Sequence, residues 1–246
     1  IGSIADPINY LLTFLAPSNR PSLNPLRLKK MEASIRTVNL TKKFHQVVAN
    51  DAVSFDVLPG EIHCLLGENG AGKSTLAECL YGFYKPDKGQ IFIDGKEVDI
   101  SSPAEAIGYG IGMVHQHFVL VSSLSVLENI VVGTKSQGLL LDLRAAEKKI
   151  KSLCDYYNVE LDLHAKVWQL PVGQQQWVEI LKTLYVGAQI LILDEPTAVL
   201  TPEESKMLFK ILQLMTDDNM SVILISHKLN EVLQSDRVTI LRKGKK

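Results

Sequence analysis

The sequence predicts an α/β fold built on a mostly parallel sheet that carries helices on both faces. Residues 61–66, 190–193 and 222–225 are nearly unbroken apolar runs, and each is followed by glycine or polar residues. Short apolar runs of this kind are typical of parallel strands that are buried on both faces. Patterns with helical spacing lie between the runs, which favours strand–helix–strand connections over hairpins.

Composition narrows the function classes before any motif is considered. The chain has 246 residues, of which 46% are hydrophobic, and its formal net charge is -1. This apolar content is enough for a core and disfavours a disordered chain, while a charge near zero disfavours a nucleic-acid binder. Three distant cysteines without a CxxC pair favour reduced thiols over a disulfide or zinc framework. No apolar stretch approaches the roughly 18 residues that a membrane-spanning helix needs.

Residues 1–33 are expected to form a weakly ordered extension outside the fold, which occupies residues 34–246. The extension holds four of the ten prolines, and its apolar stretch at 8–16 is short and has no basic run before it. Such a segment fits an extended arm better than a secretory signal.

The first part of the fold is expected to contain four strands and one helix. The strands are expected at residues 34–38, 52–58, 61–66 and 90–93, and the helix at residues 73–81. Turns rich in proline and glycine, Pro59-Gly60 and residues 86–89, separate the strands.

Later helices are marked by side chains that can cap a first turn. The expected capping boxes pair Ser102 with Glu105, Ser125 with Glu128, and Thr201 with Glu204. Asp142 can cap a further helix, another is expected at residues 174–185, and a last strand at residues 237–241. Because residues 118–170 carry helical patterns without an obvious strand, they predict a helical subdomain beside the sheet.

A glycine-rich motif follows the predicted strand 61–66. It fits the pattern GxxxxGK[ST] at every position and consists of Gly67, Glu68, Asn69, Gly70, Ala71, Gly72, Lys73, Ser74 and Thr75. The glycines allow backbone N–H groups to turn inward toward phosphate oxygens, and the helix N-terminus adds positive potential. Lys73 supplies a charge for the β- and γ-phosphates, and the Ser74 hydroxyl can ligate Mg²⁺. The motif therefore predicts a site for a nucleoside triphosphate.

Two acidic residues end the predicted strand 190–193. Asp194 and Glu195 would lie at the carboxyl edge of the sheet, beside the glycine-rich loop. We expect Asp194 to hold Mg²⁺ and Glu195 to polarise the attacking water.

Residues 34–246 resemble the ATP-binding subunit of an ABC transporter, because several motifs stand in that family's order. The resemblance implies a P-loop NTPase fold of the ABC type, with an antiparallel β subdomain beside the parallel sheet and the helical subdomain. Phe44 matches the aromatic that stacks on adenine, Gln116 the Q-loop residue that contacts Mg²⁺, and His227 the switch histidine that contacts the γ-phosphate. The catalytic residues implied in this way are Lys73, Gln116, Glu195 and His227.

The segment 170–177 resembles the family's signature motif, through which one nucleotide-binding domain covers the ATP of another. Gly173 and Gln174 are the residues expected to contact that nucleotide. Pro171 stands where the family usually has serine, and Trp177 where it often has arginine. Because proline lacks both the hydroxyl and a backbone N–H, the signature that this chain offers to a second domain is expected to be weakened.

Finer resemblances indicate the subfamily of importers for simple sugars and nucleosides. One of them is Thr201, which replaces an aspartate that is common in the loop after the acidic pair. Such proteins generally carry two nucleotide-binding halves, and this sequence is similar to the first half. The resemblance implies an ATPase that uses ATP and Mg²⁺ at the cytoplasmic face of the cell membrane. The implied partners are a transmembrane permease, a second nucleotide-binding domain (another half, another chain or a second copy) and, indirectly, an extracytoplasmic solute-binding protein.

Two other function classes remain open. A soluble ABC protein acting on DNA or ribosomes is disfavoured by the charge near zero and by the lack of zinc modules or long coiled coils. A nucleotide-binding regulator that does not hydrolyse is suggested by Pro171 and Trp177, but Asp194, Glu195 and His227 weigh against it.

Overall fold

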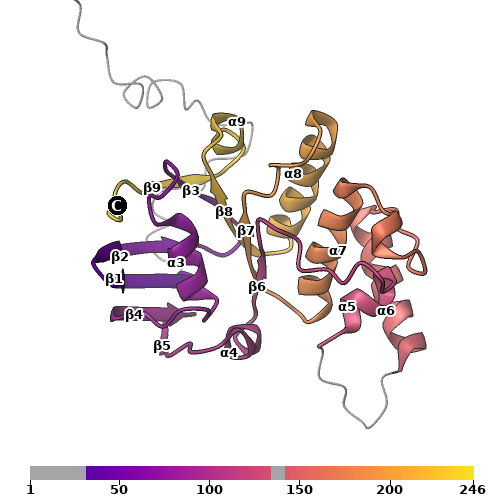
Figure 1. Ribbon diagram of the computed structural model, residues 1–246, viewed down its shortest axis with the longest axis horizontal. Helices are drawn as coiled ribbons and strands as arrows, with labels where there is room; N and C mark the ends of the chain where they lie inside the picture. The colour runs from indigo at the N-terminus through magenta and orange to yellow at the C-terminus, as the bar shows by residue number, and fades with distance from the viewer. Residues whose placement is uncertain (1–31, 134–141) are drawn as a thin grey trace, which may run out of the picture.

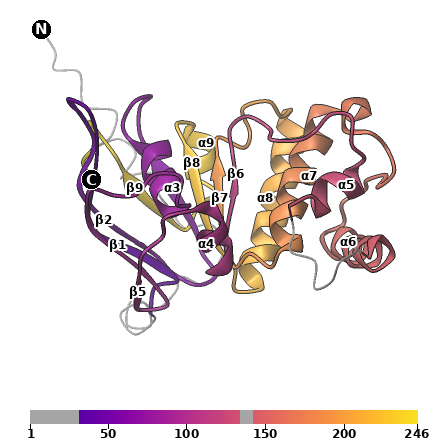
Figure 2. The same ribbon diagram turned by 60° about the horizontal axis from the view of Figure 1, so that its bottom comes forward.

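The structure is a computed structural model that describes residues 32–133 and 142–246, so nearly all of the extension expected at 1–33 lies outside the described residues. In the described part, a parallel sheet lies between an antiparallel sheet and a group of helices (Figures 1 and 2). This arrangement confirms the predicted α/β class with a parallel core and an antiparallel β region.

The parallel sheet has the strand order β6-β7-β8-β3-β9. Its strands are β3 (Ile62–Leu66), β6 (Ile111–Val114), β7 (Ile190–Asp194), β8 (Ser221–Ser226) and β9 (Arg237–Ile240). Every residue of β6, β7 and β8 is buried, as expected for strands covered on both faces. The sequence does not predict β6, because four residues that include a glycine give too short a pattern.

The antiparallel sheet has the order β2-β1-β4-β5. Its strands are β1 (Ile35–Phe44), β2 (Val47–Val57), β4 (Lys88–Ile93) and β5 (Lys96–Val98). The strands predicted at 34–38 and 52–58 are too short, because Asn39 and Ala52 adopt left-handed backbone angles (both φ 50) and the register shifts near them. These irregularities interrupt the alternation of apolar and polar residues by which a strand is recognised in the sequence.

Alternate residues of the parallel strands face two separate apolar cores, as the pleat of a strand requires. One core joins the sheet to the helices and includes Leu191, Leu193, Val222 and Leu224. The other joins the sheet to α3 and the antiparallel sheet and includes Ile190, Ile192, Ile223 and Ile225. The parallel sheet is therefore the layer on which both halves of the fold are built (Figure 2).

Helices lie on both sides of this sheet, and two of them pack against another helix instead of against the sheet (Figure 1). They are α3 (Lys73–Leu80), α4 (Pro103–Gly108), α5 (Val126–Val131), α6 (Leu143–Tyr157), α7 (Val172–Tyr185), α8 (Pro202–Asp217) and α9 (Leu229–Val232). The described residues between 118 and 170 contain α5, α6 and a 3-10 turn at Val167–Gln169, and no named strand.

The predicted caps form in full at three of four helix starts. Ser125 and Thr201 each form the complete capping box, and the Asp142 side chain accepts hydrogen bonds from two backbone N–H groups of α6. At α4 only one of the two hydrogen bonds of the predicted capping box forms. Ser102 does cap Glu105 N, but the Glu105 carboxylate accepts from the Ser101 N–H and hydroxyl instead of returning to Ser102.

The thiols are enclosed by the fold. Cys64, Cys79 and Cys154 are free and buried. Burial raises the pKa of the Cys64 thiol and that of the Cys79 thiol to about 12, so both stay protonated near neutral pH. Among the helices of the described ranges, none combines the length and the apolar character that crossing a bilayer requires.

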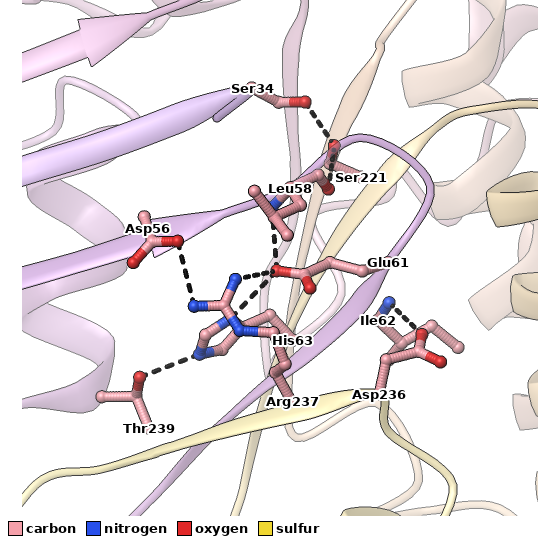
Figure 3. Close-up of polar contacts among 10 residues, drawn as sticks. All are labelled: Ser34, Asp56, Leu58, Glu61, Ile62, His63, Ser221, Asp236, Arg237 and Thr239. Carbon is pink, nitrogen blue, oxygen red and sulfur yellow. Dashed lines mark hydrogen bonds and ion pairs between the residues drawn. The ribbon is translucent and has the colours of Figure 1, made fainter. Parts of the chain in front are cut away.

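A partly buried polar cluster, which we call the Glu61 cluster, joins the two sheets (Figure 3). It consists of Asp56, Glu61, His63, Arg237 and Thr239. One Glu61 carboxylate oxygen accepts from Leu58 N at 2.8 Å and from Arg237 Nη1 at 3.0 Å. Arg237 also reaches Asp56 of β2 at 2.9 Å, so its guanidinium bridges the antiparallel and parallel sheets.

Arg237→Leu is expected to lower the free energy of unfolding by about 2–3 kcal/mol, because it leaves the buried Glu61 carboxylate without its cation. Urea unfolding monitored by circular dichroism measures this loss. Lys85→Leu is the control, since it breaks an exposed ion pair with Asp99 and is expected to cost less than about 1 kcal/mol. Equal losses in the two variants would contradict a joining role for Arg237.

Candidate functional site

The parallel register brings four loops to one edge of the sheet. Leu66, the last residue of β3, pairs with Ser226 of β8, and Asp194 of β7 pairs with Ile225. Val114, at the end of β6, pairs with Leu193. The glycine-rich loop, the acidic pair, His227 and the 115–117 turn therefore all leave the sheet at neighbouring positions.

The glycine-rich loop folds as a tight cradle between β3 and α3. Ala71 N donates to Glu68 O at 3.1 Å, and Gly70 and Gly72 have positive φ angles of 78 and 97. A Cβ on Gly72 would collide with the Ala49 carbonyl oxygen. Only glycine combines that backbone angle with this close approach, which explains the residue type at this position.

Lys73 lies buried at the start of α3 and folds back over the loop. Its ammonium group donates to Gly67 O at 2.8 Å and Glu68 O at 3.0 Å. The sequence predicts that this lysine binds phosphate oxygens. In the structure its partners are backbone carbonyl oxygens of the same loop. The ammonium group is thus held over the cradle by acceptors that anionic oxygens can replace.

Asn50 is a support that sequence reasoning missed. Its side chain is fully buried, and Nδ2 donates to Gly72 O at 3.0 Å. Gly244 N also donates to Ala71 O at 3.1 Å, from a segment far along the chain. Contacts over such sequence separations have no local pattern that could reveal them.

Asp194 and Ser74 meet at the same end of the sheet. Burial raises the pKa of the Asp194 carboxyl group above its ordinary value, while a hydrogen bond with Ser74 and the charge of Lys73 act in the opposite direction. Both side chains offer oxygen atoms as ligands, which is the chemistry that Mg²⁺ prefers.

The Glu195 carboxylate contacts two other predicted catalytic residues, Gln116 and His227. Gln116 Nε2 donates to Glu195 Oε2 at 3.2 Å, and His227 Nδ1 lies 2.9 Å from Glu195 Oε1. Glu195 has a left-handed backbone angle (φ 48), which is strained for a residue other than glycine. Strain of this kind is concentrated at functional sites, where the surroundings hold it in place.

Phe44 lies at the end of β1, within the strand and not after it. Its ring packs edge-on against Tyr84 at 4.9 Å between centroids, and the Lys42 ammonium lies 5.3 Å from the Phe44 ring. The pair Phe44–Tyr84 forms a half-buried aromatic surface, and Tyr84 is a neighbour that the sequence did not suggest.

Gly173 and Gln174 are not brought to this site. They lie at the start of α7, and both views place α7 across β6 from α3 (Figures 1 and 2). Pro171 is the N-cap of α7, and its carbonyl oxygen accepts from Gln174 N and Gln175 N. Gly173, Gln174 and Trp177 line part of an open pocket of ≈ 290 Å³, and Trp177 also packs against the helical core.

Comparison with known protein families identifies the fold's relatives. The family model described as "ABC transporter" matches residues 50–198, a span that includes the glycine-rich loop, Gln116 and the acidic pair. The chain belongs to the ABC transporter family. This result confirms the resemblance inferred from the motifs, and membership in this family implies ATP binding.

Three relatives show how similar this ABC chain is to named importers. It is 50% identical over 216 residues to the nucleoside import ATP-binding protein NupA of Lactococcus lactis subsp. cremoris, covering 87% of this chain and 43% of that protein. It is 49% identical to the guanosine import ATP-binding protein NupO of Bacillus subtilis (87% and 42% covered). It is 45% identical to the ribose import ATP-binding protein RbsA 1 of Rubrobacter xylanophilus (84% and 42% covered). The chain thus spans less than half the length of these relatives.

Solved structures agree with the fold. The ADP conformation of MJ1267, an ATP-binding cassette of an ABC transporter, superposes with a TM-score of 0.77 at 27% identity, covering 87% of this chain and 89% of that one. The dimeric structure of the bacterial ABC transporter cassette MJ0796 gives a TM-score of 0.75 at 26% identity, covering 86% and 95%.

Gly72→Ala is expected to weaken ATP binding at least roughly tenfold, equal to about 1.4 kcal/mol, because the added methyl group forces the cradle away from Ala49. Calorimetry with ATP and Mg²⁺ measures the dissociation constant. Gly187→Ala is the matched control: its φ of 90 is equally unfavourable, but its Cβ would meet open space. Similar ATP affinity in the two variants would show that the close approach at Gly72 does not shape the site.

Proposed function

We propose that this chain is the ATP-binding and ATP-hydrolysing part of a membrane importer for simple sugars or nucleosides. The observation that carries the proposal is the meeting of Gln116 and His227 on the Glu195 carboxylate, at the same sheet edge as the glycine-rich cradle. Binding alone would need only the cradle, whereas a carboxylate oriented by two side chains is suited to activate water. The solutes named for NupA, NupO and RbsA 1 support the class of solute.

The chain's own residues divide the work of phosphoryl transfer. Backbone N–H groups of the cradle and Lys73 would bind the β- and γ-phosphates and offset their charge. Glu195 would accept a proton from the attacking water, Gln116 would orient the carboxylate, and His227 would contact the γ-phosphate. The contacts at 3.2 and 2.9 Å already fix the orientation of the Glu195 carboxylate.

The donor atoms at the cradle fit Mg²⁺. No group of three or more His, Cys, Asp or Glu residues that could hold a metal occurs in the described ranges. Magnesium sites of nucleotide enzymes instead combine one or two side-chain ligands with substrate phosphates and water. The Ser74 hydroxyl and the Asp194 carboxylate supply such ligands, with Gln116 as the third residue proposed to contact the ion. When bound, Mg²⁺ would neutralise charge that develops on the phosphate oxygens.

We further propose three kinds of partner. A second nucleotide-binding domain would receive Gly173 and Gln174 of α7, which lie away from this chain's own cradle, and the similar MJ0796 cassette forms a dimer. A transmembrane permease would dock near the 115–121 segment, where Val119 and Val121 are exposed apolar side chains and the exposed Phe83 lies beside His115. A solute-binding protein would act through that permease. These partners would place the chain at the cytoplasmic face of the membrane.

Glu195→Gln is expected to retain ATP binding and to lose hydrolysis by roughly 10²–10⁴-fold, because the amide cannot accept the proton. Phosphate release at saturating ATP, together with calorimetric binding, measures both quantities. Glu203→Gln makes the same chemical change at an exposed position of α8 and is expected to leave both unchanged. Normal turnover in Glu195→Gln would remove this residue from the chemical role.

Pro171→Ser is expected to raise the ATPase rate of the assembled complex by about tenfold or more, because serine restores a hydroxyl and a backbone N–H at the start of α7. The comparison needs the complete complex, since Gly173 and Gln174 would act on a second domain. Val172→Ser adds a hydroxyl one residue away and serves as the control. An unchanged rate in Pro171→Ser would show that the native proline does not weaken the signature.

A further inference from the structure

Three polar residues join the turns that follow β7 and β8, outside the Glu195 contacts described above. Thr197 lies two residues after Glu195, Lys228 directly follows His227, and Glu231 lies on α9. Thr197 and Glu231 are 5% and 4% exposed, so their polar groups need partners within the protein. We call these three residues the Thr197 clamp.

The Thr197 hydroxyl group is at the centre of the clamp. Lys228 Nζ donates to Thr197 Oγ1 at 2.9 Å and to Thr197 O at 3.0 Å. The same hydroxyl contacts Glu231 Oε1, and Lys228 Nζ lies 3.8 Å from that carboxylate oxygen. Since Thr197 Oγ1 accepts from the ammonium group, its own proton points to the carboxylate. The hydroxyl orientation is therefore fixed from both sides.

Charge reinforces this geometry. The Glu231 carboxylate is almost wholly buried, and its charge is compensated by an ammonium group that is itself partly exposed. A buried carboxylate without a cation is costly, so the Lys228 ammonium group stabilises the buried charge of Glu231. Lys228 N also donates to Ser226 Oγ at 2.9 Å, which ties the residue to the end of β8.

The clamp is attached to the strained part of the proposed catalytic site. A residue other than glycine in the left-handed region, such as Glu195, is strained and persists only when its surroundings hold it. Glu195 N donates to Ile225 O, and Ala198 N donates to Glu195 O, so the turn is closed by its backbone. The clamp then fixes Thr197, inside this turn, against Lys228, the neighbour of His227.

We infer that Lys228 and Thr197, supported by Glu231, are positioning residues that set the contact between Glu195 and His227. The inference rests on the proposed ATPase function, because its effect on rate requires that Glu195 and His227 act in hydrolysis. The hydrogen bonds of the clamp run between the two turns and α9, so the clamp acts on the catalytic pair through these turns.

The test uses the full chain in its assembled complex and measures kcat for phosphate release and the ATP dissociation constant separately. Lys228→Met is expected to lower kcat at least roughly tenfold while the dissociation constant changes less than about threefold, because the positions of Glu195 and His227 change and the cradle does not. Lys228→Arg keeps the charge and several N–H donors, and is expected to restore most of the rate.

Thr197→Val removes the hydroxyl group at nearly the same volume. The double variant Thr197→Val/Lys228→Met is expected to be no slower than Lys228→Met alone, because both changes open the same clamp.

Lys149→Met is the matched control. Lys149 also donates to a backbone carbonyl oxygen, that of Tyr185, but on the helical side of the molecule. The kcat of Lys149→Met is expected to equal that of the unchanged chain. A kcat of Lys228→Met within about twofold of the control would overturn the inference, as would a parallel loss of ATP affinity.

A second measurement is independent of hydrolysis. A crystal structure of Lys228→Met is expected to show the Glu195 Oε1–His227 Nδ1 separation increased from 2.9 Å beyond hydrogen-bond distance. An unchanged separation would overturn the positioning role. If the unchanged chain in its complex releases no phosphate while this separation still responds to Lys228→Met, the proposed function fails and the clamp stands.

Discussion

The alignment of β3, β7 and β8 decides where the residues of the site lie. Parallel pairing places Leu66 beside Ser226 and Asp194 beside Ile225, so the three strands end within one residue of each other. Because side chains alternate along a strand, a slip of one residue would turn Asp194 toward the opposite core. The apolar cores on both faces oppose such a slip, and thus the packing of the sheet fixes the site.

The carboxyl edge of the sheet holds two buried charged groups, the Asp194 carboxylate and the Lys73 ammonium group. Asp194 is buried, and burial together with the charge of Glu195 raises its pKa above the ordinary value, although Ser74 and Lys73 favour the carboxylate. The Lys73 ammonium group is buried too and is held by carbonyl oxygens that carry no formal charge. The site therefore combines one cation and a carboxylate that are each only partly compensated, which suits it to bind a charged ligand together with a cation.

The sequence predicts those parts of the site that depend on local pattern. Lys73 and the glycines of its loop are recognisable because each residue type answers a backbone requirement within one short, continuous motif. Thr201 likewise caps α8 through its hydroxyl group, as an aspartate at this position could. Gln116 and His227 are predicted as site residues from the order of the motifs along the chain, because neither residue type is informative alone.

Other features could not be predicted, since they depend on contacts between distant residues. Asn50 supports the cradle from β2, and nothing around Asn50 in the sequence marks it. The irregularities at Asn39 and Ala52 hide parts of two strands, and β6 is too short to give a pattern. The left-handed angle of Glu195 is likewise invisible in the sequence, because it is imposed by the turn and its neighbours and not by residue type.

One short stretch of chain connects the proposed hydrolytic residues to α8, whose first turn lies against the start of α7. Glu195 begins it, Thr197 lies inside it, and Glu204 ends it in the first turn of α8. The Glu204 carboxylate accepts from Thr201 N at 2.8 Å, and it lies so close to Gly173 that a Cβ there would collide with it. The start of α7 thus lies against the first turn of α8. The turn at Glu195 and the start of α7 are therefore joined through the first turn of α8.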